Sequence, residues 1–129
     1  MSSEQKPSLY MRLGCVEGIA TVVDDFVERV LVDPRLQKNP HVTEAYRRKP
    51  KSALKYHVTE MVAWATGGPQ VYTGRSMLES HRHLHIAADE WEAFLDDLRQ
   101  TLDHHKVPLA DQKELFAILG GTRTDIVTT

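Results

Sequence analysis

Residues 67–84 read GGPQVYTGRSMLESHRHL, and they combine a helix stop with a histidine at a fixed distance after it. Gly67-Gly68-Pro69 ends a preceding helix, because glycine permits positive φ and proline bars continuation of the helical ladder. A short helix is predicted to follow from about Arg75 to Leu84, and it contains His81. The stretch therefore predicts a sharp exit from one helix, an irregular crossing, and a short helix that carries a histidine.

His81 is a candidate metal ligand because apolar residues flank it at helical spacing, with Met77 one turn before and Leu84 about one turn after. Neutral imidazole on an apolar face suits axial ligation of a haem iron. A lone histidine in such a pattern is more often a core or capping residue, so both interpretations stay open on the pattern alone. A zinc or nickel site of His81, His83 and His85 is disfavoured, because positions i and i+2 of a helix face apart.

Apolar residues recur at spacings of three and four on both sides of this stretch, which predicts amphipathic helices. Before it, one stripe comprises Ile19, Val22, Val23, Phe26, Val27, Val30 and Leu31, and a second comprises Leu54, His57, Val58, Met61, Val62 and Ala65. After it, one stripe comprises Trp91, Phe94, Leu95, Leu98 and Leu102, and another comprises Leu109, Leu115, Ile118 and Leu119. Asp33-Pro34 ends the first helix, Leu36 to Pro50 is predicted as a short helix or turn, and Pro108 takes a first helical position. No segment alternates apolar and polar residues long enough for a strand, so the chain is predicted to be all-α.

The composition is that of one globular domain over residues 1–129, with residues 1–7 as a polar N-terminal extension. At a formal net charge of -2, neither nucleic acid nor an anionic membrane is expected as a partner. No apolar run reaches the roughly 18 residues of a membrane span. Cys15 is the one cysteine, so an internal disulfide is excluded and the cytoplasm is the expected compartment. No extended exposed apolar stripe requires a partner, so a monomer or weak dimer is expected.

Three stretches together resemble the truncated haemoglobins: Leu9 to Gly14, Val22 to Leu31 followed by Asp33-Pro34, and Gly67 to Met77 with its fixed distance to His81. The last of these resembles the loop and short proximal helix of the group I members, and the similarity extends from about Ser8 to Val127. The resemblance implies a 2-on-2 helical sandwich around haem b. It also implies that His81 is the proximal iron ligand, that the Phe26 and His57 helices form the distal pair, and that the Trp91 and Leu115 helices form the other pair.

The resemblance further implies which residues line the haem. Those expected to line it are Phe26, Leu54, Val58, Met61, Met77, Leu84, Ile86 and Phe94, and ordinary core packing is compatible with this role. Tyr72 and Arg75 are candidates for hydrogen bonds to the propionates, with an exposed surface charge as the alternative for Arg75.

The sequence departs from the family on the distal side. Val27 stands where a tyrosine commonly follows the phenylalanine, and whether this valine is natural or designed stays open. Leu54 and Val58 stand where glutamines are frequent, so the usual polar cage is expected to be absent. His57 is a candidate sixth ligand. The alternative is that His57 is only a boundary residue at the edge of the buried stripe. Tyr56 replaces it as the distal donor if the register slips by one position.

Four functions follow from these expectations. The first is a haem b protein that binds dioxygen, carbon monoxide or nitric oxide, with nitric oxide dioxygenation if an external reductase supplies electrons, since no Gly-x-Gly-x-x-Gly element is present. The second is a haem enzyme with an apolar distal pocket, which is peroxidase-like or engineered for carbene or nitrene transfer. The third is a bis-histidine redox or sensor protein, and the fourth is a helical interaction module without a cofactor. No catalytic residue is assigned.

Overall fold

The computed structural model describes residues 7–128, and this range is helical with no strand. Most of the expected polar extension, residues 1–6, lies outside the described residues. The helices are α1 (Leu9–Arg12), α2 (Cys15–Val32), α3 (Pro34–Gln37), α4 (Pro40–Arg48), α5 (Lys51–Ala65), α6 (Met77–His81), a 3₁₀ turn η2 (Arg82–Leu84), α7 (Ala88–His104), α8 (Leu109–Gly120) and α9 (Arg123–Ile126). The prediction of an all-α fold is confirmed. None of the helices in this range is both long and apolar enough to cross a membrane.

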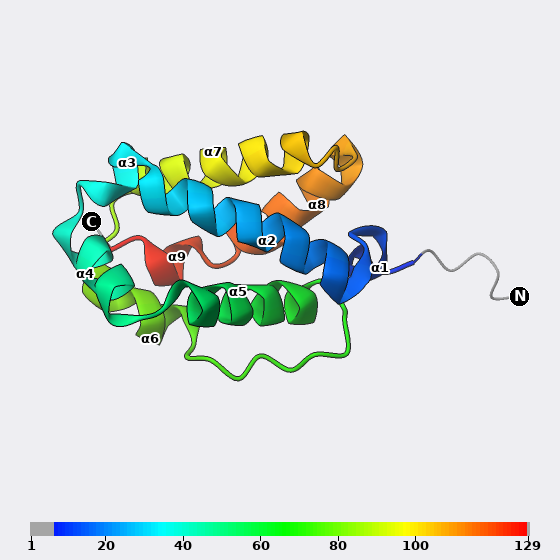
Figure 1. Cartoon of the computed structure of the whole chain (residues 1–129), viewed down its shortest axis with the longest axis horizontal. Helices are drawn as coiled ribbons and strands as arrows, with labels where there is room; N and C mark the ends of the chain where they lie inside the picture. Colours follow the sequence, from blue (N-terminus) through cyan, green and yellow to red (C-terminus); the bar gives the residue numbers. More distant parts are fainter. Residues whose placement is uncertain (1–6, 129) are drawn as a thin grey trace, which may run out of the picture.

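The long helices form two antiparallel pairs, as the family resemblance implied. Figure 1 shows α2 and α5 running in opposite directions side by side, with α7 along the other flank of α2 and α8 returning antiparallel to α7. The short helices α3, α4 and α6 gather at one end of these pairs. The loop between α5 and α6 therefore carries the chain from the α2–α5 pair to the end where α6 lies.

Apolar burial along α2 holds the first pair together. Its buried residues are Ile19, Val23, Phe26, Val27 and Val30, which recur at helical spacing on one face. Ala63 of α5 packs into the cluster that contains Val23 and Val27. Because burying one aliphatic side chain contributes roughly 1.5–3 kcal/mol, this stripe is a principal source of the stability of the pair.

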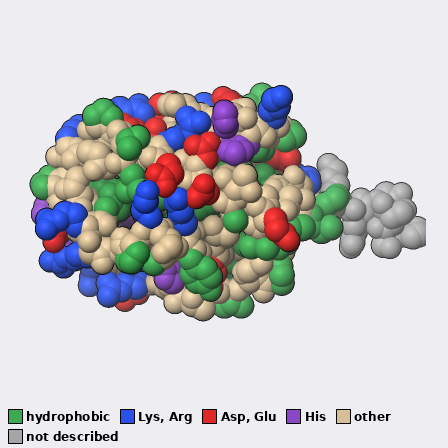
Figure 2. Space-filling view, viewed as in Figure 1, with side chains coloured by type: hydrophobic (Ala, Val, Ile, Leu, Met, Phe, Trp, Pro, Cys, Tyr) green, Lys and Arg blue, Asp and Glu red, His purple; other side chains and the backbone are tan. Residues whose placement is uncertain are grey.

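Ion pairs cross the seam between α2 and α5 at the surface. Lys55 Nζ lies 2.6 Å from Asp24 Oδ1 and 2.8 Å from Glu28 Oε2, and Lys51 Nζ lies 3.0 Å from the same Glu28 oxygen. Figure 2 shows basic and acidic side chains meeting on this face. Each such exposed pair contributes only about 0–1 kcal/mol, so the pairs align the helices more than they stabilise them.

The segment from Leu36 to Pro50 is more regular than the sequence predicted. Asp33 caps α3 by accepting a hydrogen bond from the Arg35 backbone N–H, and Pro34 takes the first helical position. Asn39 caps α4 in the same way, and Pro40 follows it. Each cap followed by proline starts a helix, because the cap satisfies a free N–H and proline has none to satisfy.

The prediction for Pro108 was wrong by one position, because this residue is the N-cap of α8 and the helix begins at Leu109.

Gly18 lies where α1 and α2 approach each other, and a side chain there has no room. A Cβ at this position would collide with the Leu13 carbonyl oxygen. We expect Gly18→Ala to lower the free energy of unfolding by about 2 kcal/mol, as overpacking does. Urea unfolding followed by circular dichroism measures the change.

Gly120→Ala is the matched control, because a Cβ there meets nothing within 4 Å. We expect this variant to stay within about 0.5 kcal/mol of the parent. Equal destabilisation by the two substitutions would contradict the close approach at Gly18.

Candidate functional site

A cavity of about 290 Å³ lies between the helix pairs, at the end where α3, α4 and α6 gather. We call it the central cavity. Most of the side chains around it are apolar, and they come from both helix pairs. Its lining comprises Phe26, Val27, Val30, Leu36, Val42, Ala45, Tyr46, Lys49, Leu54, His57, Val58, Met61, Tyr72, Met77, Ser80, His81, Leu84, Ile86, Glu90, Trp91, Phe94, Leu119, Thr122 and Ile126.

Glu60 anchors the loop that precedes α6. Its Oε1 accepts hydrogen bonds of 2.8 Å from both the backbone N–H and the hydroxyl of Thr73. These hydrogen bonds lower the pKa of the Glu60 carboxyl, the backbone one most strongly. Gly67 starts the loop with a φ of 100°, a conformation that a residue with a Cβ rarely adopts. The loop is therefore tied to α5 before it reaches the N-cap of α6 at Ser76, whose hydroxyl accepts from Glu79 N.

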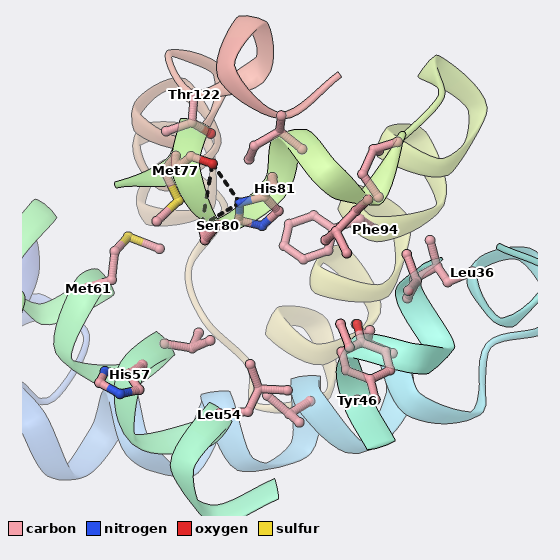
Figure 3. A pocket seen from close by; sticks show the side chains of 18 of the residues that line it. Leu36, Tyr46, Leu54, His57, Met61, Met77, Ser80, His81, Phe94 and Thr122 are labelled. Atoms are coloured by element: carbon pink, nitrogen blue, oxygen red, sulfur yellow. Dashed lines mark hydrogen bonds between the residues drawn. The ribbon is translucent and has the colours of Figure 1, made fainter. Parts of the chain in front are cut away.

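His81 is the last residue of α6, and its ring is oriented by the turn that it closes. Its Nδ1 lies 2.9 Å from the Met77 carbonyl oxygen and 2.9 Å from Ser80 Oγ (Figure 3). Because a carbonyl oxygen only accepts, Nδ1 carries the proton and Nε2 keeps its lone pair. Nε2 has no hydrogen-bond partner within residues 7–128.

Burial lowers the pKa of the His81 imidazole, and nearby His83 adds to the effect. The ring is therefore neutral at neutral pH, which is the form that ligates metals. A hydrogen bond from Nδ1–H to a backbone carbonyl is the usual way in which a protein fixes the tautomer of a ligating histidine.

Apolar side chains dominate the side of the central cavity across from His81. Val27, Leu54 and Val58 all line the cavity, and none can donate a hydrogen bond. Figure 3 shows Leu54 and His57 on this side, with His81 across the opening. The three positions for which the resemblance implies an absent polar cage are thus part of the lining, and they are apolar.

His57 lies at the edge of the central cavity with its ring half-buried. Its Nδ1 is buried without a hydrogen-bond partner in the described range, and it lies 3.9 Å from Glu60 Oε1. Its ring is 6.5 Å from that of Tyr72, and Tyr72 stacks on Trp64 at the surface. The structure thus brings His57 to the cavity but leaves one of its ring nitrogens without a partner.

Most of the residues predicted to line the haem are brought together. Phe26, Leu54, Val58, Met61, Tyr72, Met77, Leu84, Ile86 and Phe94 all line the central cavity. Tyr56 and Arg75 lie outside this lining. Tyr56 is 61% exposed and donates a hydrogen bond of 3.3 Å to Glu60 Oε2, because one position along a helix turns a side chain by about 100°. Arg75 is exposed on the extended segment before α6.

Helix α4 contributes lining residues that the sequence analysis missed. They are Val42, Ala45 and Tyr46, whose spacing of three and four marks one helical face, and Lys49, the residue that follows the helix, lines the cavity as well. That periodicity is the signal that could have found them. Burial raises the pKa of the Tyr46 phenol to about 12, and nearby Asp97 adds to the rise.

The described part of the chain contains no group of three or more His, Cys, Asp or Glu side chains that could hold a metal ion together. His83 and His85 are exposed and lie outside the cavity lining, and the His85 ring is 4.6 Å from that of His41. The arrangement therefore suits a metal that brings its other ligands with it and takes only an axial nitrogen from His81.

Comparisons with known proteins identify the family of this chain. The family model described as bacterial-like globin matches residues 8–128. The group 1 truncated haemoglobin of Mycolicibacterium paratuberculosis is 30% identical over 121 residues, which cover 94% of this chain and 85% of that protein. The group 1 truncated haemoglobin of Synechocystis is 29% identical over 117 residues, which cover 88% of this chain and 90% of that protein.

Solved structures show the same fold. The truncated haemoglobin of Tetrahymena pyriformis in its Fe(III) form matches with a TM-score of 0.84 at 23% identity, covering 95% of this chain and 100% of that one. The 2/2 haemoglobin of Synechococcus, in the cyanomet state with covalently attached haem, matches with a TM-score of 0.83 at 25% identity. The match covers 94% of this chain and 98% of that one. With a family model that spans nearly all of the described residues and relatives similar over most of both chains, this chain belongs to the bacterial-like globin family, among the truncated haemoglobins.

Proposed function

We propose that this chain is a haem b protein that binds a diatomic ligand on the side of the central cavity across from His81. Membership of the truncated globin family implies a haem cofactor and a small ligand. Dioxygen, carbon monoxide and nitric oxide are the proposed ligands. His81 would hold the haem through its iron, and the haem would supply the iron that binds such a ligand.

The observation that carries the proposal is the state of His81. It is neutral, its Nδ1–H is held by the Met77 carbonyl, and its Nε2 is unengaged at the wall of an apolar cavity. A neutral ring nitrogen that keeps its lone pair and has no protein partner is available to ligate a metal. These features fit haem, because its macrocycle needs apolar walls and its iron needs one strong nitrogen ligand.

Polar groups at the edge of the cavity fit the propionates. Lys49 and Tyr72 both line the cavity, and Lys49 has no acidic partner among residues 7–128. Their ammonium and phenol groups would donate to the carboxylates of the haem. Arg75, which was predicted for this role, would have to turn inward from the surface to share it.

A second function is supported by His57. Its place in the cavity lining and its unpartnered Nδ1 make it the candidate sixth ligand of a bis-histidine redox or sensor protein. In that case a diatomic ligand binds only after His57 leaves. The two functions differ in the coordination of the iron when no ligand is added.

We expect ferrous, haem-reconstituted protein to show the sharp split visible bands of six-coordinate iron if His57 ligates, and one broad five-coordinate band if it does not. His57→Ala would then convert the first spectrum into the second. His104→Ala, an exposed histidine at the end of α7, is the control and leaves the spectrum unchanged.

If the parent and His57→Ala are both five-coordinate, ligand binding is the function and the bis-histidine alternative fails. A parent that acquires no Soret band with hemin would overturn the haem function itself and would favour a helical interaction module.

Turnover chemistry is a further part of the proposal. Nitric oxide dioxygenation consumes one dioxygen, one nitric oxide and one electron per nitrate formed, so it needs an external reductase. Peroxidase-like oxidation needs a group that moves protons in the cavity. Transfer of carbenes or nitrenes would use the same apolar lining.

Monomeric or weakly dimeric assembly and a cytoplasmic location belong to the proposal as well.

A further inference from the structure

Tyr46 brings a hydroxyl group to a cavity whose other walls on that side are apolar. Val27, Leu54 and Val58 offer no donor. Figure 3 shows Tyr46 and Leu54 on the side across from His81, with the Tyr46 hydroxyl directed toward the interior near Phe94. Tyr46 packs against two of the three apolar clusters of the core, so its ring is held firmly in this place.

The hydroxyl of Tyr46 makes no hydrogen bond within the described range. Tyr46 lines the central cavity, so this hydroxyl group is free to donate to a ligand that enters it. Burial first and the nearby Asp97 second raise the pKa of this phenol to about 12. Tyr46 therefore keeps its proton at neutral pH and can donate it.

Asn39 fixes helix α4 to the segment that carries His81. Its Oδ1 accepts from the backbone N–H of His41 at 2.9 Å, which caps α4. Its Nδ2 donates to the Leu84 carbonyl oxygen at 2.9 Å and to Glu90 Oε1 at 3.2 Å. One buried side chain thus links the start of α4 to η2, so the distance between Tyr46 and His81 is set by the fold and not by the ligand.

We propose that the Tyr46 hydroxyl is the hydrogen-bond donor to a polar diatomic ligand in the central cavity, and that α4 is the element that supplies it. The inference rests on the proposed function. It assigns to α4 the stabilising role that the apolar residues of α2 and α5 cannot fill.

The donor selects among ligands by their polarity. Dioxygen takes on negative charge when it binds ferrous iron, whereas carbon monoxide stays nearly apolar. A hydrogen bond from a phenol therefore slows the release of dioxygen much more than that of carbon monoxide. A merely structural role of Tyr46 would change both ligands together.

We expect Tyr46→Phe, in the haem-loaded protein, to raise the dioxygen dissociation rate about tenfold to a hundredfold, which is the loss of one hydrogen bond. The carbon monoxide dissociation rate should change less than about threefold, and the carbon monoxide stretch should move to higher wavenumber. Tyr56→Phe makes the same chemical change at an exposed tyrosine outside the cavity lining and should leave all three quantities unchanged.

The infrared spectrum of the unsubstituted protein tests the same contact without any substitution. A donor near the ligand lowers the carbon monoxide stretch below its position in an apolar pocket, and a single band at the apolar position would overturn the inference. The inference would also be overturned if Tyr46→Phe left dioxygen release unchanged, or if Tyr56→Phe reproduced the effect. A parent that does not bind haem through His81 would instead overturn the proposed function.

Discussion

His81→Gly is expected to abolish iron ligation from α6 and to weaken haem binding by on the order of 100-fold or more. Losing a group that merely orients a metal ligand costs about 10–100-fold in affinity. In the proposed function His81 supplies the ligating nitrogen itself, so its loss is expected to cost more. Transfer of hemin from the variant to an excess of a colourless acceptor globin measures the change.

Added imidazole should restore the spectrum of the parent. The glycine leaves a space the size of the lost ring, and the Met77 carbonyl still accepts the proton on one nitrogen of the added imidazole. His83→Gly removes an exposed histidine two residues away and should bind haem like the parent. If His81→Gly kept the spectrum and haem retention of the parent, another residue would be the proximal ligand.

Asp97→Asn is expected to stabilise the protein increasingly as the pH rises. Asp97 is buried on α7 and lies 3.4 Å from Arg35, which also pairs with Asp33 at 2.9 Å. Burial raises the pKa of the Asp97 carboxyl from its usual 3.8 to about 7, and the neighbouring Asp33 contributes to the rise. The pKa of Asp33 shifts in the opposite direction, because hydrogen bonds from Arg35 lower it to about 2.

The sign of the pH dependence follows from which state holds the proton. Between about pH 4 and pH 7 the folded chain keeps a proton on Asp97 that the unfolded chain has released, so the contribution of Asp97 to stability falls as the pH rises. Asp33 contributes stability that is lost only as the pH falls from 3.8 toward about 2. Asparagine at position 97 cannot ionise, so the variant does not lose stability at this position as the pH rises from about 4 to 7. The contribution of Asp33, which is lost only at low pH, remains.

We therefore expect the advantage of Asp97→Asn over the parent to be about 2 kcal/mol greater at pH 8 than at pH 5. Urea unfolding of the haem-free protein at the two pH values measures it. Asp96→Asn is the matched control, because Asp96 also pairs with Arg35 but is only partly buried, and hydrogen bonds from Arg35 lower its pKa. Its effect should stay within about 0.5 kcal/mol and should not change between the two pH values. An advantage of Asp97→Asn that is equal at both would contradict the raised pKa.

The long helices could be read from the sequence because their evidence is local. The stripe around Phe26 needed only the helical repeat and the Asp33-Pro34 stop, and α2 ends at Val32 as that stop predicts. The segment that contains α3 and α4 was harder, because its short elements have no long apolar stripe and Leu36 to Pro50 was predicted only as a short helix or turn. In the structure Asn39-Pro40 starts a helix, with the asparagine as cap and the proline in the first turn.

The site divides in the same way. The all-α fold, the helix that carries His81, and the apolar character of Val27, Leu54 and Val58 could be predicted from the sequence. They depend only on residue type and on spacing along one helix. The tertiary structure alone decided that Tyr46 lines the central cavity, that Tyr56 and Arg75 stay outside it, and that Asp33 and Asp97 share Arg35. These contacts join residues of different helices, so they depend on how the helices cross, and burial of the whole core sets that crossing.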